Sequence, residues 1–175
     1  MVSYTEAFDT STPMGRAMIG IVGVFAQLER ELTSERVRAA ISIRAQQGKR
    51  MCSQVTGYDL SGKDGLKVNP NEAIYIAFLF DKYIERKNFS EVAKLAREAG
   101  YTGKRGGSPE AWHIERILIN PIYAGYILYK GVLYKGQHQA IITPKTFNRV
   151  QRIIKFQGKS LGRMRNRLIL YVPEK

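Results

Sequence analysis

Apolar residues recur at alternating steps of four and three in the first part of the chain. Six positions follow this spacing: Met14, Met18, Ile21, Phe25, Leu28 and Leu32. They are called the apolar stripe below, because the spacing places them on one face of an α-helix in a heptad-like row. Thr12 can cap such a helix, Pro13 fits its first turn and Gly48 suits its end. The pattern predicts one helix over about 13–47, about 50 Å long at ~1.5 Å per residue.

A helix of this length is too long to be covered by its own domain in a chain of 175 residues. The apolar stripe is therefore expected to form an oligomer interface, giving a dimer or a tetramer. The alternative is that the helix folds back on the rest of the chain and leaves a monomer. Gly20 and Gly23 lie in the interior of this predicted helix, where each costs about 1 kcal/mol. Either they allow the close approach of another backbone or they are simply tolerated.

The remaining pattern predicts a second, compact domain. Turn-forming residues over 51–70 indicate a linker, and residues 71–157 alternate between apolar helices and one antiparallel hairpin near 126–134. The first 50 residues would form one domain and 158–175 a basic tail. The predicted fold class is thus mainly α with a small antiparallel β-hairpin (α+β), in which a long protruding helix precedes the compact domain.

The net charge of the chain indicates which class of molecule it binds. The chain has 28 Lys and Arg against 15 Asp and Glu, a net charge of +13, which favours nucleic acid first and an anionic membrane surface second. The sequence contains no run of about 18 apolar residues, the length needed to cross a bilayer, and the first residues do not resemble a signal peptide.

The single cysteine, Cys52, is expected to be a free thiol and fits a reducing cytoplasm. The two histidines and Cys52 lack metal-ligand spacing, so no metal or cofactor is expected.

The cations are concentrated in the second half of the predicted helix and beyond it. Residues 13–32 carry two basic and two acidic residues, whereas 33–50 carry five basic residues and one acidic residue. The first half is interpreted as a packing surface and the second as a DNA-contacting rod. Its expected phosphate-binding residues are Arg36, Arg38, Arg44, Lys49 and Arg50. The competing interpretation is a merely solvated face.

A basic loop that leads into a helix, 103–116, is the best candidate for contacts with base edges. The candidate residues are Lys104, Arg105, His113 and Arg116. Trp112 and Ile117 are expected in the core instead. His138 could equally close a turn or touch a phosphate.

Two blocks of sequence resemble the serine recombinases. Thr12-Pro-Met-Gly-Arg-Ala-Met18, followed by Phe25-Ala-Gln-Leu-Glu-Arg, resembles the long helix that ends their catalytic domain. Residues 57–155 resemble the recombinase domain of the large members. The motifs are Gly57-Tyr58, Trp112, Ile117-Leu-Ile-Asn-Pro-Ile-Tyr-Ala-Gly125, and His138-Gln-Ala-Ile-Ile142 before Phe147.

The resemblance implies site-specific DNA recombination, namely integration, excision or inversion, with double-stranded DNA as partner. In this family a serine attacks a phosphodiester to form a phosphoserine link, and arginines neutralise the developing charge. Glu29 and Arg30 match supporting residues, and Arg30 is implied to face the active site or the scissile DNA; the alternative is a surface ion pair. The block with the nucleophilic serine and the four cysteines of a zinc ribbon have no match here. The chain alone is expected to hold DNA and to leave plasmid topology unchanged. The alternatives are a non-catalytic DNA-binding regulator and a basic RNA-binding protein.

Overall fold

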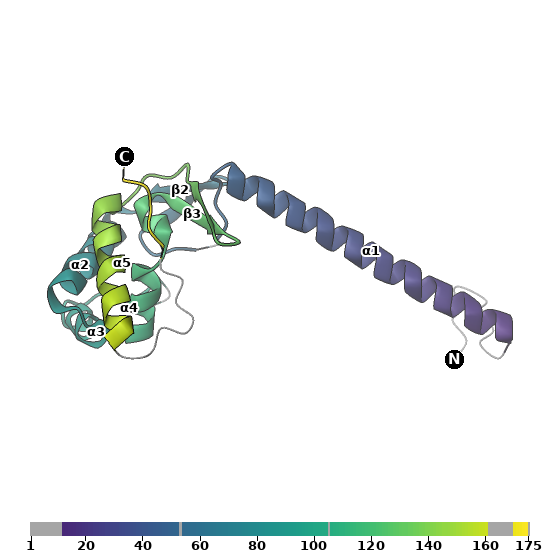
Figure 1. Ribbon diagram of the computed structural model, residues 1–175, viewed down its shortest axis with the longest axis horizontal. Coiled ribbons are helices and arrows are strands. Elements are labelled where there is room, and N and C mark those ends of the chain that lie inside the picture. Colours follow the sequence, from purple (N-terminus) through teal and green to yellow (C-terminus); the bar gives the residue numbers. More distant parts are fainter. Residues whose placement is uncertain (1–11, 53, 105, 161–169, 175) are drawn as a thin grey trace. The chain divides into compact units, whose positions relative to one another are not determined.

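The computed structural model describes residues 12–52, 54–104, 106–160 and 170–174 (Figure 1). The chain divides into two units, Met1–Ile43 and Arg44–Lys175. The described residues are mainly helical with two small antiparallel hairpins. This confirms the predicted fold class, with one hairpin more than the sequence indicated.

The first element is α1, Pro13–Gln46, a single helix of 34 residues. The Thr12 side-chain oxygen accepts a hydrogen bond from the Gly15 amide at 3.0 Å and so satisfies one free N–H of the first turn. The helix stops at Gly48, whose φ of 67° lies in the left-handed region. A Cβ at that position would lie 2.2 Å from the Lys135 carbonyl oxygen, so only glycine fits there.

Residues 51–70 were expected to be a linker, and this expectation needs correction. They contain a hairpin of β1, Tyr58–Ser61, and β2, Gly65–Val68, in which Tyr58 pairs with Val68. The Tyr58 side chain is 1% exposed and belongs to the hydrophobic core of the second unit. Because Tyr58 is the only buried residue of β1, the strand has no alternation of apolar and polar residues that would identify it in the sequence.

Four helices surround that core: α2, Pro70–Arg86; α3, Phe89–Glu98; α4, Ala111–Leu118; and α5, Pro144–Ser160. Figure 1 shows them as one cluster with the hairpins at one end. The N-terminal amides of α2 and α3 donate hydrogen bonds to the side-chain oxygens of Asn69 and Asn88, respectively. The fully buried helix residues come from every one of the four: Ile76, Leu79, Phe80, Tyr83, Val92, Ala96, Ile114, Leu118, Phe147 and Val150.

The second hairpin follows the short 3₁₀ helix η1, Pro121–Ala124, and consists of β3, Tyr126–Tyr129, and β4, Val132–Lys135. Lys130 and Gly131 connect the strands with φ angles of 48° and 81°. Two positive φ angles are typical of the type I′ turn, which matches the twist of a tight hairpin. The sequence had indicated this hairpin without its turn type.

The end of the chain also differs from the expected basic tail. Leu170 and Val172 are buried. The Asn148 amide on α5 donates to the Val172 carbonyl at 2.8 Å and accepts from the Val172 amide at 2.9 Å. Residues 170–174 therefore pack on the domain as an extended segment. Residues 161–169, which include several of the tail's cations, lie outside the described part of the chain.

Candidate nucleic-acid interface

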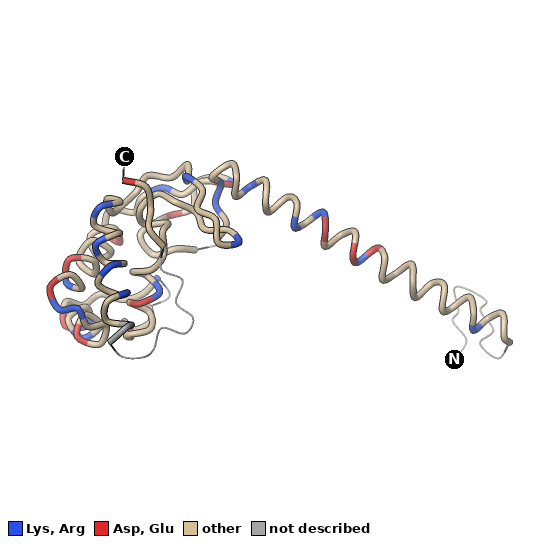
Figure 2. Tube along the Cα trace, in the orientation of Figure 1, with Lys and Arg blue, Asp and Glu red and all other residues tan. Residues whose placement is uncertain are grey.

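In the first unit, the sequence-predicted residues Arg30, Arg36 and Arg38 are exposed on α1, as is Glu29. Figure 2 shows cations along the second half of the helix and mostly uncharged residues along the first half. An exposed guanidinium can reach a phosphate without losing an internal partner. These arginines are consequently the most accessible of the predicted phosphate contacts.

In the second unit, Arg44, Lys49 and Arg50 are drawn together by the turn between β1 and β2. Asp64 in that turn accepts from Arg44 at 2.6 Å and lies 3.5 Å from the Lys49 ammonium. The Arg50 guanidinium donates to the carbonyls of Cys52 and Lys63, both at 2.8 Å. Arg44, Lys49 and Arg50 therefore fix residues 44–50 to the hairpin, and the Asp64 carboxylate partly neutralises the first two.

Lys104 is held inside the second unit. Its ammonium group donates to the Tyr58 carbonyl, to Asp59 at 3.1 Å and to Glu72 at 3.2 Å, and its side chain is 22% exposed. Burial alone would lower the pKa of Lys104, but the bonds to the two carboxylates outweigh it and the pKa is raised. All three partners come from residues far away in the sequence. Lys104 is thus placed to fix the 103–109 loop rather than to contact a base, and Arg105 lies outside the described residues.

Replacing Lys104 by Met should cost about 1.5–3 kcal/mol of unfolding free energy, because Glu72, Asp59 and the Tyr58 carbonyl each lose one of their hydrogen-bond donors. The hydrogen bond to Lys104 also lowers the pKa of Asp59. The ion pair therefore contributes fully between the ordinary pKa values of ~3.9 for Asp and ~10.4 for Lys. Its contribution is lost as pH falls through the lowered pKa of Asp59, or rises through the raised pKa of Lys104.

Urea denaturation of the unmodified chain and Lys104→Met across a pH series measures this difference. Lys94→Met on α3 is the matched control, because Lys94 is exposed and its ion pair with Glu98, one helical turn away at 3.9 Å, lies on the surface. Equal stabilities for the unmodified chain and Lys104→Met at neutral pH would contradict the proposed anchoring role.

The exposed face of α4 carries the residues that sequence reasoning partly missed. Trp112, expected in the core, is 55% exposed. The His113 ring stacks on it, with 4.3 Å between centroids and 17° between planes. The Arg116 guanidinium lies 5.9 Å from the indole centroid. Ile117, by contrast, packs against the core as predicted. Trp112 is two positions before the buried Ile114, which places it on the other side of the helix; that spacing was the signal available in the sequence.

His138 belongs to the framework of the domain. Its Nε2 lies 2.7 Å from the Ile122 carbonyl oxygen, so this nitrogen carries the proton, and the ring meets Tyr58 edge-on at 5.4 Å. Burial lowers the pKa of His138. Of the two roles expected for it, the structure places it in the first, closing the turn. The Asn120–Gly125 motif is the centre of this framework, since the Tyr123 carbonyl also accepts from the amides of Ile141 and Ile142.

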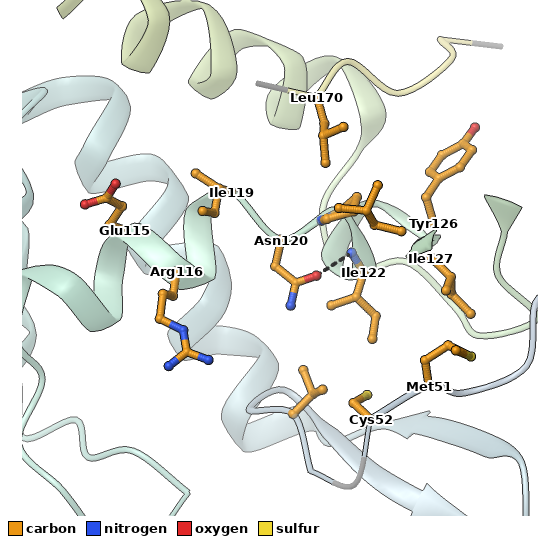
Figure 3. A pocket seen from close by; sticks show the side chains of 13 residues that line it. Met51, Cys52, Glu115, Arg116, Ile119, Asn120, Ile122, Tyr126, Ile127 and Leu170 are labelled. Atoms are coloured by element: carbon orange, nitrogen blue, oxygen red, sulfur yellow. Dashed lines mark hydrogen bonds between the residues drawn. The ribbon is translucent and has the colours of Figure 1, made fainter. Parts of the chain in front are cut away.

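A cavity of about 610 Å³ lies beside the α4–η1 junction (Figure 3). Its lining is mostly apolar and includes Met51, Ile119 and Leu170. Cys52 is a free thiol at its edge, and burial raises the pKa of that thiol. A protonated thiol is a poor nucleophile and a poor metal ligand. Glu115 and Arg116 of α4 also line this cavity, and Figure 3 shows their side chains pointing in different directions from the helix.

Within the described residues, no three side chains of His, Cys, Asp and Glu are grouped so that they could hold a metal ion. The described helices also include none that is both long and apolar enough to cross a membrane.

Two families match the chain. The family described as Recombinase matches residues 70–157, and that described as Resolvase, N terminal domain, matches residues 1–50. A DNA-invertase of Escherichia phage P1 is 45% identical over 47 residues, 27% of this chain and 25% of that protein. The serine recombinase gin of Escherichia phage Mu is 40% identical over 47 residues, 27% of this chain and 24% of that protein. The chain thus spans about a quarter of the length of these curated relatives.

Two solved structures have a similar fold. One, described as the crystal structure of an LSR–DNA complex, is 26% identical, with a TM-score of 0.63 over 71% of this chain and 39% of that chain. The other, described by the sequence requirements of the Listeria innocua prophage attP site, is also 26% identical. It has a TM-score of 0.64 over 71% of this chain and 53% of that chain.

Proposed function

The chain belongs to the serine recombinase family, and on this premise we propose that it binds duplex DNA as the DNA-holding part of a site-specific recombinase. The observation that carries the proposal is the likeness of fold, over 71% of the chain, to a structure described as a complex with DNA. The net charge of +13 supports a polyanionic partner. The family matches do not favour a non-catalytic regulator or an RNA-binding protein. Because its proposed partner is DNA, we also propose that the chain resides in the cytoplasm.

The proposed interface has two parts. Arg36 and Arg38 of α1 contact phosphates and set affinity, and Arg30 faces the DNA or the active site of the complete enzyme, supported by Glu29. His113 and Arg116 of α4 contact base edges, together with Arg105. Arg44 and Lys49 add weaker phosphate contacts, because they share Asp64. The proposed interface does not include Arg50, Lys104 and His138, because their polar groups form hydrogen bonds within the domain.

DNA affinity should fall steeply with salt. Each neutralised phosphate releases condensed counterions, which gives a slope of about −0.9 per contact in a plot of log affinity against log salt. Arg36→Gln combined with Arg38→Gln should therefore flatten the slope by about 1.8 and weaken binding to all sequences alike. Fluorescence anisotropy of a labelled mixed-sequence duplex over a salt series measures both quantities.

The matched control is Arg152→Gln, which removes an exposed arginine from α5 and should leave the slope nearly unchanged. An equal change for the control would mean that only overall charge matters, and would remove α1 from the interface. A structured RNA measured at one common salt concentration gives the second comparison. Tighter binding to the RNA than to the duplex would overturn the proposal.

We also propose that the chain self-associates through the apolar stripe on α1. Its side chains are 40–77% exposed, which is unusual for six large apolar residues in a row. At Gly20 and Gly23 an added Cβ would have no atom within 4 Å. Open space beside both glycines is compatible with the approach of a partner helix and with simple tolerance, so their role stays open.

A further inference from the structure

Trp112 is the only tryptophan of the chain, and it stands on the first turn of α4 with more than half of its surface in contact with solvent. The opposite side of the same helix is filled by Ile114 and Leu118, which are fully buried. The core therefore does not need the indole. A large aromatic ring left in water on a well-packed helix is a feature of contact surfaces rather than of a folding core.

The indole is also held in place. His113 stacks against it at 4.3 Å, and Arg116 places its guanidinium 5.9 Å from the ring centroid. These three residues are called the α4 platform. A second cavity of about 520 Å³ adjoins the platform, and Gly103, Gly107 and Pro109 of the preceding loop form part of its wall. Lys104, anchored to Asp59 and Glu72, fixes that loop. The platform thus consists of an indole stacked with an imidazole, with a guanidinium over the indole ring.

We infer that the α4 platform enters the major groove of duplex DNA, where the Trp112 indole packs against the methyl group of a thymine. The inference rests on the proposed DNA-binding function and specifies how one surface contacts sequence. The thymine methyl is the one apolar group among the base edges in the major groove. The five donors of Arg116 suit an adjacent guanine edge or phosphate. The first turns of a short exposed helix fit the groove, which admits an α-helix.

Local charge favours DNA over a protein partner for this surface. Arg116 is exposed and its guanidinium lies over the indole ring, whereas the neighbouring Glu115 side chain points in a different direction from α4 (Figure 3). The platform therefore combines an exposed aromatic ring with a positive charge close to it, in a chain of net charge +13. That combination complements a base step flanked by phosphates. A protein surface docked on the platform is the competing outcome that the experiments below distinguish.

The first experiment uses Trp112 as its own reporter. The 175-residue chain is titrated with a duplex pool of random sequence while tryptophan emission and the anisotropy of a DNA label are followed together. Burial of the indole should shift the emission to the blue in step with the anisotropy. Phe156→Ala removes an 82% exposed aromatic from α5 and should bind as the unmodified chain does. A blue shift that depends on protein concentration without DNA would assign the platform to a protein interface and overturn the inference.

The second experiment tests the thymine methyl. The duplex most enriched from the pool is prepared with thymine and with deoxyuridine, which lacks the methyl group. For the unmodified chain the substitution should weaken binding about fourfold per contacted methyl, equivalent to ~0.8 kcal/mol for one buried carbon group. For Trp112→Ala the two duplexes should bind alike. Equal losses in both proteins would overturn the inference.

The two levels of the proposal fail in different ways. If the unmodified chain binds no duplex at low salt, the proposed function fails. If it binds with unchanged tryptophan emission, and Trp112→Ala keeps full affinity and the same sequence preference, only the α4 platform is excluded. Circular dichroism of Trp112→Ala and Trp112→Phe should match the unmodified chain, because the indole lies outside the core; a lost fold would contradict its assignment to the surface.

Discussion

The chain is expected to sediment as a dimer or a tetramer, and Phe25→Glu is expected to shift it to a monomer. Each large apolar side chain that leaves water contributes ~1.5–3 kcal/mol, and a symmetric interface buries Phe25 twice. The substitution also places two like charges opposite each other. Together these effects should weaken association by at least about a hundredfold, or ~3 kcal/mol. Sedimentation equilibrium over a concentration series measures the change.

Ala26→Glu is the matched control, because it adds the same charge one residue along. That position lies about 100° around the helix from Phe25, outside the apolar stripe. Association should then be nearly unchanged. A monomer for the unmodified chain at every concentration would overturn the pairing proposal, and equal losses for the two variants would show that charge alone had been tested.

The long helix was accessible from the sequence because its signals are local and repeated. Thr12 provides the cap, Gly48 provides the left-handed stop, and the apolar residues between them keep a helical period. Such agreement between cap, period and stop does not depend on the rest of the fold. The α1 helix, Pro13–Gln46, accordingly lies within one residue of the predicted range.

The first hairpin was missed for the opposite reason. Its strands are four residues long, and only Tyr58 of β1 is buried. Glycines at 57, 62 and 65 resemble the composition of a linker. Gly57 is required by packing instead, since an added Cβ would lie 2.8 Å from Ile141 and 3.0 Å from Ile76. Contacts between residues so distant in sequence leave no local pattern.

The candidate DNA contacts were also only partly predictable from the sequence. Residue type and local charge placed Lys104 and His138 among the contacts, but their partners lie far away in the sequence. Lys104 binds Asp59 and Glu72, and His138 binds the Ile122 carbonyl. Only the fold brings these groups together. Trp112 was assigned to the core by its chemistry, although its position relative to Ile114 already favoured the surface.

Replacing Tyr58 by Ala is expected to destabilise the second unit by about 3–5 kcal/mol, the usual cost of removing a buried aromatic side chain. The single proton of the Tyr58 hydroxyl is donated mainly to the Gln139 carbonyl at 2.8 Å, with the Ile122 carbonyl at 3.3 Å as a longer, shared acceptor. Burial raises the pKa of Tyr58 further above its ordinary value, so the hydroxyl also remains a donor in moderately alkaline solution. Tyr58→Phe keeps the ring and should cost only about 1–3 kcal/mol, because the Gln139 carbonyl loses the Tyr58 donor while the Ile122 carbonyl keeps His138.

Urea denaturation followed by circular dichroism gives the unfolding free energies of the unmodified chain, Tyr58→Ala and Tyr58→Phe. Leu60→Ala is the control within the same strand. Leu60 is exposed, so its truncation should change the unfolding free energy by no more than about 0.5 kcal/mol. The contrast is decisive because both residues belong to β1, Tyr58–Ser61, and differ chiefly in burial. If Tyr58→Ala were as mild as Leu60→Ala, the segment 51–70 would behave as a linker after all. A large loss for Tyr58→Ala alone would instead make the hairpin part of the folding unit that positions Lys104 and, through it, the loop beside α4.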